Sequence, residues 1–167
     1  MIGNEKFHAI VVAAAKAKFG IWGGAQIREF CLSILDGNDD NANIASIAMC
    51  EKGDIYCVND GWSNLERELK LDIISENILL LVYAIDVCEQ IVSEIISPIQ
   101  GAMLIAAAAR RSSSDHLPIL DPFVYVDSEM PARMAEELVF NDALKEEAMA
   151  VLSHKNRVFR DVARETR

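Results

Sequence analysis

Four carboxylates stand at spacings that could hold metal ions on a helix. Asp72 and Glu76 are four residues apart, and Asp86 and Glu89 are three apart, so each pair would share one helix face. Inward-pointing carboxylates of this kind bind paired metals in helical bundles. The more ordinary interpretation is the solvated face of an otherwise buried helix. A small metal-dependent hydrolase with these helix-borne carboxylates is therefore an alternative function.

Residues 36–43 offer a second set of oxygen ligands, in a segment rich in Asp and Asn. Calcium needs several oxygens close together, and its common loop requires Gly at the sixth position and Glu at the twelfth. Counted from Asp36, these positions hold Asn41 and Ile47. The pattern favours a solvated loop, and we expect no cofactor. No pattern of nucleophile and base accompanies the three scattered histidines, which are His8, His116 and His154.

Acidic residues are concentrated in one part of the chain. Residues 29–94 contain fourteen Asp and Glu against three Lys and Arg, a formal charge of −11, whereas the whole chain carries −10. Such a field attracts basic partners and repels phosphates, so we expect a basic protein partner and no binding to nucleic acid or to a membrane.

Within this acidic block, we predict a partner-binding surface made of carboxylates and one tryptophan. Trp62 lies beside Asp60 in a glycine-containing segment, where an aromatic ring can anchor a partner. The alternative is that the ring closes the end of a core. The predicted partner-binding residues are Asp36, Asp39, Asp40, Glu51, Asp54, Asp60 and Trp62.

The four cysteines have long and irregular spacings, which favour reduced thiols over a disulfide framework. Cys50 and Cys57 could still approach each other across a hairpin, so a disulfide between them is the alternative. The apolar run at residues 7–15 lacks the positively charged flank of a signal peptide and is interpreted as a helix. Charges interrupt the apolar segment 78–96, which we therefore interpret as a core helix. We expect a cytoplasmic protein.

The length of 167 residues and the apolar content of 51% predict one domain, residues 1–167, that is mainly α-helical. Ser63 and Glu66 form a capping box that predicts a helix start, and Ser75 is a point at which the following helix could break. Ser97 and Pro98 predict another start. Further helices are expected at residues 4–19, 25–35 and from 128 onward.

One small β-hairpin is expected at residues 44–58, where two segments rich in Ile, Val and Tyr flank Gly53. The competing interpretation is a short helix that is capped by Asn43 and ends at Gly53. Residues 122–127 alternate like a strand and would make the fold α+β if they added a third strand.

These observations favour a non-enzymatic acidic binding protein that occludes a basic partner protein. A toxin-neutralising immunity or inhibitor protein and a cargo chaperone both match this description. A third possibility is a structural homo-oligomer, because residues 99–109 carry small side chains that permit close helix packing.

Overall fold

The structure is a computed structural model that describes residues 4–35, 41–113, 116–130 and 137–167. Over these residues the secondary structure is helical and contains no strand, which confirms the mainly α prediction. The chain divides into two compact units. Unit 1 comprises Met1–Ile74 and Ala163–Arg167, and unit 2 comprises Ser75–Val162. That residues 1–167 form a single domain stays a prediction.

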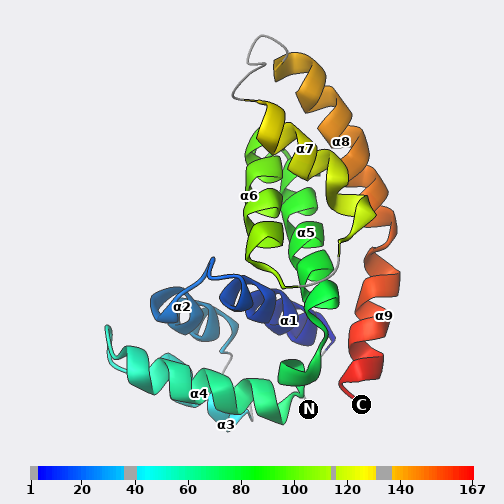
Figure 1. Cartoon of the computed structure of the whole chain (residues 1–167). Helices are drawn as coiled ribbons and strands as arrows, with labels where there is room; N and C mark the ends of the chain where they lie inside the picture. The colour runs from blue at the N-terminus through cyan, green and yellow to red at the C-terminus, as the bar shows by residue number, and fades with distance from the viewer. Residues whose placement is uncertain (1–3, 36–40, 114–115, 131–136) are drawn as a thin grey trace. The chain divides into compact units, whose positions relative to one another are not determined.

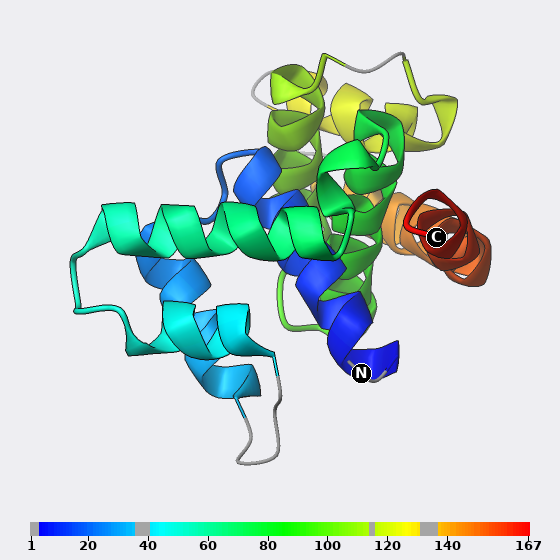
Figure 2. The ribbon, with the colours of Figure 1, turned by 90° about the horizontal axis from the view of Figure 1, so that it is seen from below.

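Unit 1 is built from helices that pack on one another in chain order. Helix α2 packs on α1, α3 and α4, and α3 packs on α4 (Figure 2). Buried apolar residues at helical spacing, such as Ile44, Ile47 and Ala48 on α3, supply the core. The elements are α1 (Asn4–Lys18), α2 (Gly24–Ile34), α3 (Ala42–Met49), α4 (Ile55–Glu68) and the short 3-10 helix η1 (Leu71–Ile73).

Unit 2 is organised around α5, which contacts α6 and α8, while α6 also contacts α7 (Figure 1). Nine of the seventeen residues of α5 are buried, so this helix is the centre of the unit's core. The elements are α5 (Glu76–Val92), α6 (Pro98–Arg111), η2 (Pro118–Leu120), α7 (Asp121–Glu129), α8 (Glu137–Ser153) and α9 (Lys155–Glu165), whose last residues are assigned to unit 1. No helix in the described parts of the chain has the length and hydropathy needed to cross a bilayer.

The predicted β-hairpin at residues 44–58 is wrong. Its first half lies in α3, whose N-terminus is capped by Asn41, with Oδ1 accepting from the Ile44 amide at 3.0 Å. Its second half begins α4, where Asp54 Oδ1 accepts from the Cys57 amide at 3.0 Å. Two helix caps therefore decide the local structure over strand propensity. Gly53 has the expected positive φ of 97°, but it joins two helices.

The competing prediction of a short helix is closer to the structure, although the cap is Asn41 instead of Asn43 and the helix ends at Met49. Residues 122–127 are not a strand either, because they lie within α7. In that helix Phe123 and Val126 are both buried, and their spacing of three suits a helix face. The α+β alternative is thus also wrong.

The structure confirms two of the predicted helix boundaries and contradicts a third. Ser97 Oγ accepts from the Gln100 amide at 3.2 Å with Pro98 in the first turn, which confirms the predicted start of α6. Ser75 precedes α5, so the predicted break at this residue is also confirmed. The capping box at Ser63 and Glu66 is wrong as a helix start, because both residues lie inside α4. That helix already begins at Ile55, about two turns earlier, with Asp54 as its N-cap.

Candidate functional site: the surface of the α3–α4 hairpin

A disulfide joins the two helices of the α3–α4 hairpin. Cys50 follows the last residue of α3, Cys57 lies in the first turn of α4, and their Cα atoms are 6.0 Å apart. The expectation of reduced thiols is therefore wrong for this pair, and the alternative pairing is correct. The antiparallel helices bring the cysteines together much as the expected strands would have done. Cys31 and Cys88 are reduced and buried.

Three large apolar side chains are exposed beside the disulfide. Met49 is 80% exposed, Tyr56 is 85% exposed and Ile55 is 57% exposed. Met49 and Tyr56 each directly precede one of the bonded cysteines. Because neighbouring Cα atoms are about 3.8 Å apart, the Cα atoms of Met49 and Tyr56 lie within roughly 14 Å of each other. Apolar area gathered in this way is typical of a binding surface.

Three of the predicted acidic residues lie on the same hairpin and are exposed. Glu51 and Asp54 are in the loop between the helices, and Asp60 is on α4, four residues after Tyr56. None of the three forms an ion pair with any described residue. We call the following set the hairpin surface: Met49, Glu51, Asp54, Ile55, Tyr56 and Asp60.

The other predicted site residues are placed differently. Asp36, Asp39 and Asp40 lie outside the described residues. Trp62 is only 5% exposed, so it belongs to the core of unit 1 rather than to a contact surface. Its indole nitrogen is buried and has no hydrogen-bond partner among the described residues, although it lies close enough to Glu66 to affect that carboxyl. Burial raises the pKa of the Glu66 carboxyl, and the Trp62 indole opposes that rise.

A pocket of about 290 Å³ adjoins the hairpin surface. Asp54 and Ile55 belong to both, and the far wall is the glycine-containing start of α2. Arg28 on α2 fixes this arrangement, because its Nε donates to the Cys50 carbonyl at 2.7 Å. The mostly apolar lining could receive one side chain of a partner. The lining residues are Gly23, Gly24, Ala25, Gln26, Arg28, Gly53, Asp54, Ile55 and Val58.

The four carboxylates considered for metal binding do not form a site. Glu76 accepts hydrogen bonds from Ser113, Asp86 accepts from Gln90 Nε2 at 2.9 Å, and Glu89 pairs with Lys155. Asp72 lies in η1, in the other unit. Within the described residues, no three His, Cys, Asp or Glu side chains are grouped so that they could hold a metal ion.

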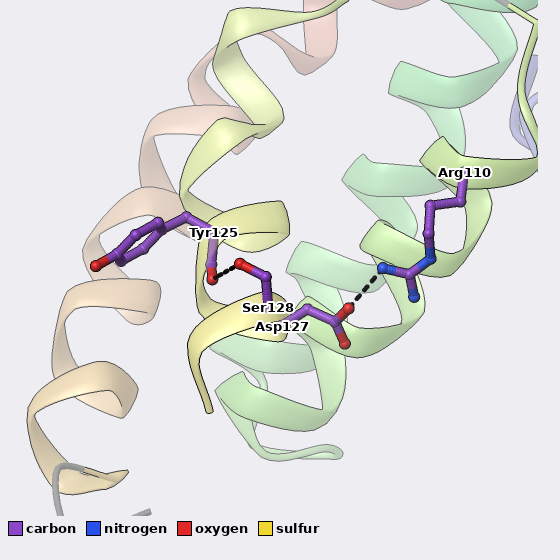
Figure 3. Close-up of polar contacts among 4 residues, drawn as sticks. All are labelled: Arg110, Tyr125, Asp127 and Ser128. Atoms are coloured by element: carbon purple, nitrogen blue, oxygen red, sulfur yellow. Dashed lines mark hydrogen bonds and ion pairs between the residues drawn. The ribbon is translucent and has the colours of Figure 1, made fainter. Parts of the chain in front are cut away.

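A second pocket, of about 260 Å³, lies in unit 2 beside α6, η2 and α7. Its polar residues are already paired: His116 Nε2 lies 2.7 Å from Asp121 Oδ1, and Arg110 Nη1 lies 2.6 Å from Asp127 Oδ2. Figure 3 shows the second pair joining α6 to α7. Sequence reasoning missed the contact of His116 with Asp121, which depends on the η2 turn. The pocket adds no nucleophile to these pairs.

The small residues of α6 are used inside unit 2. Gly101, Ala102, Ala106 and Ala108 are buried, and a Cβ at Gly101 would overlap the Ile91 side chain of α5. The close helix packing that these small side chains predict therefore occurs between α6 and α5. The homo-oligomer through residues 99–109 stays a prediction.

Comparison of the chain with family models, with curated proteins and with solved structures found no match. The hairpin surface combines exposed apolar groups with carboxylates that have no ionic partner among the residues that the structure describes, and it is the arrangement with the clearest capacity to bind.

Proposed function

We propose that this protein is a non-enzymatic binding protein that docks a basic protein partner on the hairpin surface and thereby occludes it. One observation carries the proposal: exposed Met49, Ile55 and Tyr56 share a disulfide-closed hairpin with Glu51, Asp54 and Asp60. An immunity or inhibitor protein and a cargo chaperone are the two forms that such occlusion could take.

The apolar and acidic residues would contribute in different ways. Fully burying one large apolar side chain is worth about 1.5 to 3 kcal/mol, so the three together supply most of the contact free energy. The carboxylates would accelerate encounter with a basic partner and disfavour acidic ones. The disulfide reduces the ordering cost of binding because it holds Met49 and Tyr56 close together beforehand.

A cytoplasmic location remains part of the proposal. Disulfides in cytosolic proteins are usually transient or redox-sensing. In that compartment we therefore expect the Cys50–Cys57 bond to form and break reversibly. For the hydrolase alternative, the separate partners of Glu76, Asp86 and Glu89 offer no support.

Selection of peptides from a random displayed library tests the proposal without knowledge of the natural partner. The oxidised protein is the bait, and enriched peptides are expected to combine Lys or Arg with large apolar residues. Synthetic copies should bind in solution, and their affinity should fall as salt is raised, because exposed charges are screened. Peptides that lack basic residues, or an empty selection, would contradict the proposal.

Matched variants separate the hairpin surface from the rest of the molecule. The double substitution Glu51→Gln and Asp60→Asn should weaken a selected peptide several-fold, mainly through slower association. Met49→Ser with Tyr56→Ser should weaken it further through faster dissociation. Glu146→Gln, an exposed carboxylate on α8, is the control and should change neither rate. If all three variants changed peptide affinity equally, the peptide would bind outside the hairpin surface.

A further inference from the structure

We propose that Cys50 and Cys57 are a thiol–disulfide exchange site for a dithiol reductant, and that the redox state of this pair controls the order of the hairpin surface. The consequence for partner docking rests on the proposed function. The exchange site itself rests on the position of the two cysteines in the hairpin.

The two cysteines differ in their exposure. Cys50 is only 4% exposed, whereas Cys57 is partly exposed in the first turn of α4. The loop between them, residues 51–54, is exposed throughout. An incoming thiolate therefore reaches the Cys57 sulfur more readily, and attack in line with the disulfide makes Cys50 the leaving group.

Exchange proceeds through a mixed disulfide between the reductant and Cys57. A thiolate of the reductant bonds to Cys57 Sγ, the bond between the two cysteine sulfurs breaks, and Cys50 leaves as a thiolate that takes up a proton. The second thiol of the reductant, as a thiolate, then attacks the reductant sulfur that is bonded to Cys57. This step closes the reductant's own disulfide and releases Cys57, which is also protonated. The reductant is oxidised to a disulfide by two electrons, and the protein gains two thiols.

The structure provides a hydrogen-bond acceptor for the reduced state. Cys50 Sγ lies 3.4 Å from the carbonyl oxygen of Ser46, one turn earlier in α3. A protonated Cys50 can donate to this oxygen. The other two cysteines do not compete in the exchange. Cys31 and Cys88 are both fully buried, so a reductant or labelling reagent in solution meets only the hairpin pair.

Reduction would loosen only one end of the hairpin. At the far end, Glu68 on α4 accepts from Asn41 and Asn43 at 3.0 and 2.5 Å, and this contact does not depend on the disulfide. At the near end, the hydrogen bonds seen among the described residues are those from Arg28 to the Cys50 carbonyl and from the Cys57 amide to Asp54, together with short turn contacts. Met49 and Tyr56 would then lose their fixed spacing, and the surface would have to be ordered on binding.

Hydrogen exchange and thiol labelling test the exchange site directly, with dithiothreitol as the reductant. Native protein treated with millimolar dithiothreitol and then iodoacetamide should gain two alkyl groups, both on the hairpin pair. Amide exchange over residues 50–57 should rise about tenfold or more, since a loop-closing constraint is lost, while exchange near Leu65 stays unchanged. A disulfide that resists reduction in the native protein, or unchanged exchange after reduction, would overturn the proposal.

The Cys50→Ala/Cys57→Ala double variant is the matched control. It should show the raised exchange without reductant, and dithiothreitol should change nothing further. Peptides selected on the oxidised protein should bind the reduced protein and this variant at least about threefold more weakly. Equal affinities for the oxidised protein, the reduced protein and the variant would overturn the proposal that the redox state of this pair governs docking. If selection yields no peptide, the proposed function fails, whereas labelling and hydrogen exchange still decide the fate of the exchange site.

Discussion

Gly61 on α4 lies directly against Ile47 on α3, and a Cβ atom at Gly61 would fall 2.7 Å from Ile47 Cγ1. Ile47 is fully buried and has little room to move. The two helices of the hairpin therefore approach this closely only because position 61 has no side chain.

Substitution Gly61→Ala should destabilise the protein by about 1 to 2 kcal/mol, even though alanine is the better helix former. Urea unfolding followed by circular dichroism measures the change. In an Ile47→Ala background the same substitution should be neutral or stabilising, since the obstructing side chain is gone. The same cost in both backgrounds would show that the contact is not responsible.

The two roles of Asp54, helix cap and surface charge, can be separated by substitution. Asp54→Ala removes the acceptor for the Cys57 amide and should lower stability by about 0.5 to 2 kcal/mol. Asp54→Asn keeps a cap and should be close to wild type in stability. The asparagine variant should nevertheless weaken selected basic peptides, because the charge is lost. If both variants are equally unstable, the side chain does more than cap α4.

Cys31 and Cys88 should be inert towards thiol reagents in the folded protein. Burial raises the pKa of each thiol to about 12, so only about one molecule in ten thousand carries a thiolate at pH 8. Oxidised native protein should react negligibly with a chromogenic disulfide reagent, and two thiols should appear after denaturation. Rapid reaction of the native protein would contradict the burial of these residues.

Tyr83 should make stability depend on pH in the alkaline range. Burial, assisted by nearby Asp86, raises its pKa from 10.0 to about 12. The unfolded chain therefore releases this proton first, and the stabilising contribution, present below pH 10, is lost as the pH approaches 12. Tyr83→Phe should reduce that loss by about 1 kcal/mol in denaturant titrations between pH 9.5 and 11.5. An unchanged pH dependence in the Tyr83→Phe variant would contradict this contribution.

Helix content and several boundaries could be predicted from sequence because their causes are local. Ser97 with Pro98 specifies a start, and Gly20, with φ of 65°, follows α1 as expected. The hairpin was misassigned because short segments rich in Ile and Val suit a strand as well as a buried helix face. The caps at Asn41 and Asp54 were the local signals that distinguish the two.

The candidate site was only partly accessible to the same reasoning. Glu51, Asp54 and Asp60 are exposed on the hairpin, as carboxylates usually are. The exposure of Met49 and Tyr56 could not be predicted, because it depends on which neighbouring elements leave those positions uncovered. The burial of Trp62 agrees with the alternative that its ring closes a core, although the residue lies within α4 and not in a loop.

Each unit contains one buried free thiol, Cys31 on α2 in unit 1 and Cys88 on α5 in unit 2. A trapping reagent reaches either sulfur only when the surrounding helices open. The labelling rates of the peptides that contain Cys31 and Cys88 therefore report the opening of the two units separately in one experiment. Equal rates at every temperature would mean that the two units unfold together.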